Sequence, residues 1–95
     1  MDIKEYESII IIKPNLNESK QKKVENKYSK LITKYGELDK VENLGQKKLA
    51  YEIKENKEGI YIEFYFKSKE IFVTELEKRY RTDEDIIKFI VIKTN

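Results

Sequence analysis

The chain has 95 residues, and its 20 Lys and Arg against 18 Asp and Glu leave a formal net charge of only +2. A chain of this length can build one two-layer hydrophobic core but not two, so we expect a single domain over residues 1–95. The near balance of charge excludes a globally cationic protein. Any affinity for nucleic acid must therefore depend on where the lysines lie.

The composition also narrows the chemistry. Because the sequence has no Cys and no His, it offers no disulfide, no thiolate metal site and no imidazole general base. We therefore expect no enzymatic activity, no metal and no cofactor. The longest apolar run, Ile9 to Ile12, is too short to span a membrane, and residues 1–5 do not resemble a signal peptide, which predicts a cytoplasmic protein.

The first half of the chain predicts a strand followed by a helix. The strand is expected at about 5–13, because four consecutive isoleucines follow an alternating start and a Pro-Asn turn signal comes next. Asn17 is then expected to cap a helix that ends at Gly36. Charged residues, mostly lysines, cover the outer face of this helix, and we interpret them as a solvated surface in preference to an RNA footprint. The apolar residues recur at helical spacing: Val24, Tyr28, Leu31, Ile32 and Tyr35.

The middle of the chain predicts two strands. Leu38 to Ile53 is expected to be a strand interrupted near Gly45, and residues 54–59 are expected to be a polar turn. The segment from Ile60 to Phe66 alternates between apolar and mixed positions, which is typical of a strand with one buried face.

The last third predicts a helix and a final strand. Ser68 is a candidate helix cap, and a helix of roughly eleven residues is expected after it. The residues that define this helix by their spacing are Ile71, Phe72, Leu76, Arg79 and Tyr80. After a short acidic segment, the alternating residues 86–93 predict a final strand.

The order strand, helix, strand, strand, helix, strand predicts a ferredoxin-like α+β fold. Its two helices lie on one face of a four-stranded antiparallel sheet, in which the first strand lies between the third and the fourth. The residues expected on the helix-covered face are Tyr6, Ile10, Ile12, Phe64, Phe66, Phe89 and Val91. The opposite face is expected to be uncovered and to bind a partner through Ile9, Ile11, Tyr61, Tyr65, Ile90 and Ile92.

No catalytic arrangement is visible. The loop after the first strand, residues 13–17, has no glycine and cannot easily wrap backbone amides around a phosphate. The acidic run Asp83 to Asp85 could shift pKa values or bind a hard cation, but a solvated turn is the stronger interpretation. Residues 58–64 lack the basic-Gly-aromatic opening of an RRM motif, so RNA stacking on the open sheet is a minor hypothesis.

The segment from Gly45 to Lys54 is the most informative. Lys47 and Lys48 follow the glycine break, and Tyr51 lies on the apolar strand that comes next. Positive charge beside an aromatic ring on a sheet edge suits contact with a nucleic-acid phosphate and a stacked base. A charged edge strand also protects a sheet against aggregation, and the residues alone do not decide between these roles.

This segment resembles the signature of the bacterial small-subunit ribosomal protein six family, in which a glycine and basic residues precede Leu-Ala-Tyr, with an Ile two positions further on. The likeness extends over nearly the whole chain, and it implies the same ferredoxin-like fold. Leu44 stands where many relatives have Trp, and Lys88 stands where Arg is common. The other segments that agree in order are Tyr6-Glu7, Pro14-Asn15-Leu16, Tyr35-Gly36, Glu58-Gly59-Ile60-Tyr61 and Leu76-Glu77 with Arg79 and Arg81.

The resemblance implies a structural, ribosome-associated protein that binds small-subunit rRNA together with ribosomal protein eighteen. It implies no reaction, no small-molecule substrate and no membrane contact. The RNA-binding residues that it implies are Lys4, Lys47, Lys48, Tyr51, Lys88 and Lys93. Two other classes stay open on the residues alone: a ligand-sensing or dimerising regulatory module of the same fold, and a small phosphatase-like enzyme.

Overall fold

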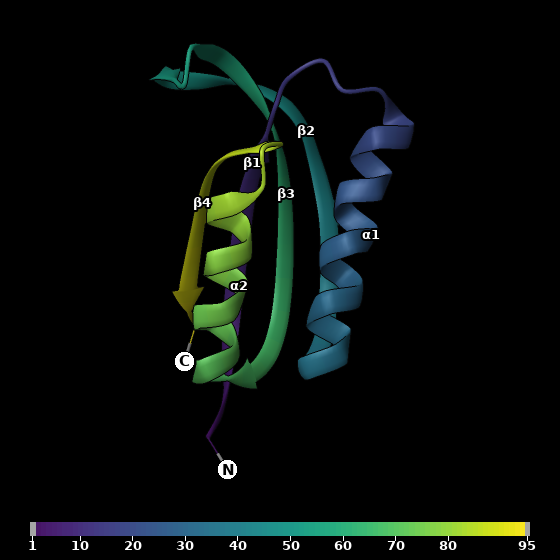
Figure 1. Ribbon diagram of the computed structural model, residues 1–95, viewed down its shortest axis with the longest axis vertical. Coiled ribbons are helices and arrows are strands. Elements are labelled where there is room, and N and C mark those ends of the chain that lie inside the picture. Colours follow the sequence, from purple (N-terminus) through teal and green to yellow (C-terminus); the bar gives the residue numbers. More distant parts are fainter. Residues whose placement is uncertain (1, 95) are drawn as a thin grey trace.

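The computed structural model describes residues 2–94 and contains four strands and two helices (Figure 1). The elements are β1 (Ile3–Ile12), α1 (Glu18–Tyr35), β2 (Glu37–Ile53), β3 (Asn56–Lys69), α2 (Glu70–Thr82) and β4 (Ile86–Lys93). The strands form one antiparallel sheet in the order β2-β3-β1-β4, and both helices cover the same face of it (Figure 1). The predicted ferredoxin-like fold is confirmed, with β1 between β3 and β4 and β2 at the edge.

The two helices begin in different ways. At α1 the Asn17 side chain accepts a hydrogen bond from the backbone N–H of Lys20 at 2.9 Å, so the predicted cap is confirmed. At α2 the prediction was wrong. The cap position is Lys69, whose side chain makes no capping bond, while the buried Ser68 hydroxyl donates to the Lys69 carbonyl at 3.0 Å. Ile71, expected in the core stripe of α2, is 78% exposed.

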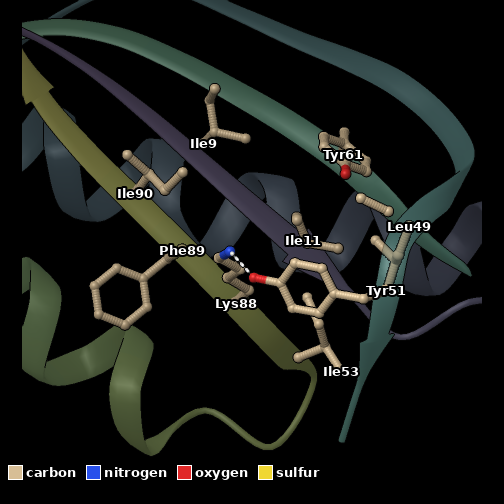
Figure 2. A pocket seen from close by; sticks show the side chains of 10 residues that line it. Ile9, Ile11, Leu49, Tyr51, Ile53, Tyr61, Lys88, Phe89 and Ile90 are labelled. Carbon is tan, nitrogen blue, oxygen red and sulfur yellow. Dashed lines mark hydrogen bonds between the residues drawn. The ribbon is translucent and has the colours of Figure 1, made fainter. Parts of the chain in front are cut away.

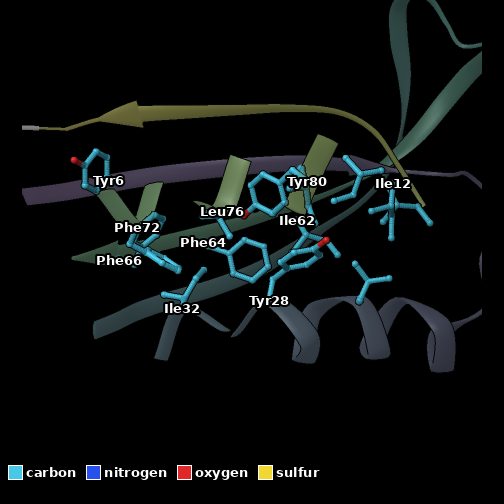
Figure 3. Close-up of a cluster of buried hydrophobic side chains, with 14 residues drawn as sticks. Tyr6, Ile12, Tyr28, Ile32, Ile62, Phe64, Phe66, Phe72, Leu76 and Tyr80 are labelled. Carbon is cyan, nitrogen blue, oxygen red and sulfur yellow. The ribbon is translucent and has the colours of Figure 1, made fainter. Parts of the chain in front are cut away.

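The hydrophobic core lies between the helices and the sheet (Figure 3). Strand periodicity sends alternate side chains of β1 and β3 toward the helices, where Phe64 is fully buried at the centre. The Ser8 hydroxyl, also fully buried, hydrogen-bonds the Tyr80 hydroxyl of α2 at 2.7 Å, so this polar pair is satisfied within the core. All seven residues predicted for the helix-covered face pack in this cluster, with Phe89 and Val91 partly buried at its border.

The β2–β3 connection is shorter than the sequence pattern indicated. Only Lys54 and Glu55 form the turn, because Ile53 already pairs with Asn56 and residues 56–59 belong to β3. Both turn residues have positive φ, +48° and +66°, as a type I′ turn requires. The prediction of a six-residue polar turn was therefore wrong, because a two-residue turn with neither Gly nor Asn has no clear sequence signal.

Phe64→Ala should lower the free energy of unfolding by roughly 3–5 kcal/mol, because it leaves a cavity at the centre of the sheet. Denaturant unfolding followed by circular dichroism measures the change. Ile71→Ala is the matched control at an exposed site and should cost less than about 0.5 kcal/mol. A loss below about 1 kcal/mol at Phe64 would contradict its central place in the core.

Glu55→Gly should stabilise the protein by about 0.5–1 kcal/mol, because glycine adopts a positive φ without the steric cost that a side chain carries. Glu52→Gly, in the extended part of the same hairpin, should instead destabilise by a similar amount. Thermal melts of the two variants test this opposite sign, and equal effects at both positions would argue against the turn conformation.

Candidate protein and nucleic-acid interface

The face of the sheet that the helices leave open is divided into two zones. At one end the β2–β3 hairpin bends over the sheet toward β4 (Figures 1 and 2). There Leu49 of the hairpin covers Ile11 and Ile87, and the three form a second buried cluster bordered by Ile53 and Tyr61. The prediction of a wholly uncovered face was therefore wrong at this end. Ile11, expected to contact a partner, is only 6% exposed and forms the floor under the hairpin.

A bulge in β4 makes this second cluster possible. Ile11 pairs with Lys88 and Ile12 with Ile86, so Ile87 is an extra residue in the strand. Ile86 packs in the main core, while Ile87 packs against Ile11 on the open side. Beyond the bulge the alternation resumes, and it places Lys88 and Ile90 on the open face.

A groove of about 170 Å³ runs between the hairpin and the strands β1 and β4 (Figure 2). The Tyr51 ring, 65% exposed, reaches across from the hairpin toward Lys88. The Lys88 ammonium lies 3.4 Å from the Tyr51 hydroxyl and 5.6 Å from the ring centroid. Lys47 likewise lies 5.8 Å from the ring centroid of Tyr61. Two lysine–tyrosine pairs therefore border a mostly apolar groove.

The predicted RNA-binding residues fall into two groups at opposite ends of the sheet. The group at the hairpin end comprises Lys47, Lys48, Tyr51 and Lys88. Lys47 is opposite Gly59 and Lys48 is opposite Glu58 on β3. Because side chains alternate along a strand, these two neighbouring lysines point to opposite faces of the sheet.

Lys4 and Lys93 form the other group. Lys93 pairs with Tyr6 on the neighbouring strand, and the Lys4 ammonium lies 3.9 Å from Glu70 of α2. Lys4 is seven positions before Ile11 on β1, which corresponds to roughly 23 Å in a strand. One small phosphate site therefore cannot include both groups.

The rest of the open face carries the other predicted partner-binding residues. Ile90 and Ile92 are 44% and 48% exposed, and Ile9, Tyr61 and Tyr65 are partly buried. The register places Ile9 between Ile90 and Glu63, and it places Tyr65 beside Glu7. These five residues lie on three adjacent strands and form one surface, as the alternation predicted.

Two carboxylates on this face were not singled out in the sequence. Glu7 and Glu63 lie diagonally across the β1–β3 pair, and the Tyr65 hydroxyl donates to Glu7 at 3.2 Å. A hydrogen bond with the Glu7 carboxyl, partial burial and the charge of Glu7 raise the pKa of Glu63. Only the register between β1 and β3 brings these two residues together. The sequence offered one signal: each is a charged residue on the face of its strand that otherwise carries mostly apolar or aromatic side chains.

Asp83, the first residue of the acidic run, serves the fold. The Asp83 carboxylate accepts hydrogen bonds from the Tyr28 hydroxyl at 2.5 Å, from the Lys27 ammonium and from the Asp85 backbone N–H, both at 2.9 Å. Burial alone would raise the pKa of Asp83, but these hydrogen bonds outweigh it and hold the pKa below its usual value. Residues 2–94 contain no group of three or more acidic side chains arranged to hold a metal ion.

The comparison with known families decides the classification. The family model described as ribosomal protein S6 matches residues 5–93. The chain belongs to the ribosomal protein S6 family. Two relatives that carry the name small ribosomal subunit protein bS6 show how far the likeness extends. The protein of Helicobacter acinonychis (strain Sheeba) is 41% identical over 92 residues, and that of Heliobacterium modesticaldum (strain ATCC 51547 / Ice1) is 35% identical over 92 residues.

The S6 relatives differ in length. The match covers 96% of this chain in both cases, but the chain spans only 65% of the Helicobacter protein against 96% of the Heliobacterium protein. A crystal structure of 30S ribosomal protein S6 from Thermotoga maritima superimposes with a TM-score of 0.89 at 36% identity, covering 96% of this chain and 87% of that one. None of the helices within residues 2–94 has the length and apolar character needed to cross a membrane.

The structure explains why two positions of the S6-like segments, Gly45 and Gly59, are glycines. Gly45 has a φ of +85° at the register shift between β2 and β3, a conformation that glycine adopts without strain. Gly59 allows a close approach, because a Cβ atom there would lie 2.4 Å from the Ile11 side chain. Together they let the hairpin bend and pack over the open face.

Glu63→Gln should raise the free energy of unfolding by roughly 0.2–1 kcal/mol near pH 7, because it removes like-charge repulsion with Glu7. The pKa of Glu63 is raised in the folded protein, so its ionised form lowers the free energy of unfolding at any pH above that folded pKa. This loss of stability disappears as the pH falls toward 4.5, the ordinary pKa of a glutamate. Urea unfolding at several pH values measures this. Glu77→Gln on α2 is the control, and a gain at Glu63 that does not depend on pH would contradict the carboxylate pairing.

Proposed function

We propose that this chain is a structural component of the small ribosomal subunit, which binds small-subunit rRNA together with ribosomal protein eighteen and catalyses no reaction. Its membership of the ribosomal protein S6 family supports this role. The chain's own geometry adds one observation that carries the proposal. The apolar open face and the basic hairpin end meet at the groove, so one continuous surface can serve a protein and an RNA at the same time.

The hairpin end suits contact with a phosphate backbone. Tyr51 holds the Lys88 ammonium on the surface, and Lys47 is exposed beside Tyr61. Lysine contacts of this kind position a protein on RNA without reading the base sequence. Lys4 and Lys93, at the other end of the sheet, would give a second point of contact with an extended RNA.

The open face suits a protein partner. Half-exposed isoleucines on neighbouring strands form an apolar surface that a monomer rarely leaves uncovered. A protein bound over Ile90 and Ile92 would also reach the groove, where Lys88 lies at the rim. On this proposal, binding of the partner and binding of the RNA would support each other.

The two other functional classes have less support. A ligand pocket usually measures roughly 300–1,000 Å³, so the groove under the hairpin, at about 170 Å³, does not favour the ligand-sensing module. A phosphatase-like enzyme would need a base or nucleophile, whereas the Asp83 carboxylate is engaged in hydrogen bonds that connect α1 to the α2–β4 turn.

Lys47→Ala and Lys88→Ala should each weaken binding of an rRNA fragment to the assembled protein pair and reduce the salt slope by about one unit, because each removes one phosphate contact. Stability should hardly change. Titrations at several salt concentrations test this, with Lys23→Ala on the outer face of α1 as the matched control. If both variants keep the affinity and slope of the unsubstituted protein, the hairpin end is not the RNA surface.

A further inference from the structure

The charges on the open face are distributed unevenly. The hairpin end carries Lys47 and Lys88. The part of the face beyond the groove carries Glu7 and Glu63 as charges unpaired within the described part of the chain, while two lysines there are engaged, Lys40 with Glu42 and Lys67 with Glu37 and Asp39. Apolar side chains lie between the two zones. A partner bound across this face therefore meets cations at one end and carboxylates at the other.

Glu7 and Glu63 are the carboxylates of this zone without a counter-charge among residues 2–94, although the Tyr65 hydroxyl donates a hydrogen bond to Glu7. The nearby Lys40 pairs with Glu42 at 3.4 Å. Ile92 lies beside Glu7, and Ile9 lies beside Glu63. Covering these isoleucines would also remove water from the carboxylates, which is costly unless the covering surface supplies a positive charge.

We propose that the open face binds a protein segment with an apolar anchor for the groove and an arginine or lysine that pairs with Glu7 and Glu63. The inference rests on the proposed function, because this segment would belong to the protein partner. An arginine fits best, since its planar guanidinium can bridge two carboxylates. Glu7 precedes Ile9 by two residues and Ile11 by four, so the anchor and the cation should be roughly 7–13 Å apart.

The same charges argue against two other occupants. An RNA strand would bring phosphates against Glu7 and Glu63, which repel them. A second copy of this chain, stacked about a two-fold axis parallel to the strands, would bring its own carboxylates against these two. An axis across the strands would instead bring them against Lys47 and Lys88, and sedimentation tests that arrangement. A basic and apolar protein segment is the occupant that satisfies the carboxylates and the apolar side chains beside them, and it leaves Lys47 and Lys88 to the RNA.

The experiment is calorimetric titration of purified ribosomal protein eighteen from the same organism into the full chain, at about 50 mM and about 500 mM salt. Glu7→Gln and Glu63→Gln should each weaken binding about tenfold or more at low salt and less at high salt, because they remove a charge that faces a cation. Glu77→Gln, on the other side of the sheet, should bind like the unsubstituted protein. Ile90→Ser should weaken binding equally at both salt concentrations.

The outcomes separate the inference from the proposed function. If the unsubstituted chain does not bind ribosomal protein eighteen, the proposed function fails and the inference with it. If it binds, and the Glu7 and Glu63 variants bind equally well, only the inference is overturned. Sedimentation that shows a dimer dissociated by Ile90→Ser, or rRNA binding by the chain alone that Glu63→Gln strengthens, would assign the face to a second copy or to RNA. Unfolding curves of each variant verify that reduced affinity does not reflect a loss of folding.

Discussion

The pairing of β1 with both β3 and β4 is the constraint on which the rest of the structure depends. Ile10 of β1 pairs with Ile62 on one side and with Phe89 on the other, and all three pack toward the helices. Because side chains alternate along a strand, this register also fixes which residues face the open side. A slip by one residue would exchange the core-facing residues for Glu7 and its neighbours. The register of β1 therefore determines both the composition of the core and that of the open face.

The second buried cluster is the link between these two layers. The hairpin can fold over the sheet only because Gly59 leaves room for Ile11 and because the β4 bulge turns Ile87 to the open side. Burial of this cluster fixes the hairpin over the sheet and thereby holds Tyr51 beside Lys88. A small apolar contact therefore positions charged groups on the surface. The shape of the open face thus comes from packing, and the same packing sets where its charged groups lie.

Most of the fold could be predicted because periodicity is a local property. The alternation in β1 and β3 and the helical spacing in α1 identified the core residues, and the order of elements left one common topology. The Glu7–Glu63 pair could not be found in the same way, since it depends on the register between two strands. The bend of the hairpin depends on a bulge in β4, which leaves no clear mark in the sequence. The wrong helix cap at Ser68 has a similar cause, because tertiary burial outweighed a local preference.

An exposed apolar face favours self-association, and the carboxylates on this face oppose one form of it. Two copies that stacked their open faces about a two-fold axis parallel to the strands would place Glu7 and Glu63 of one against the same residues of the other, away from water. Such a contact costs more than the isoleucines gain, because a buried carboxylate needs a counter-charge. A basic partner supplies that charge. The same two residues therefore disfavour this homodimer and would favour a complex with a basic partner, which is how a difference in affinity between two partners arises.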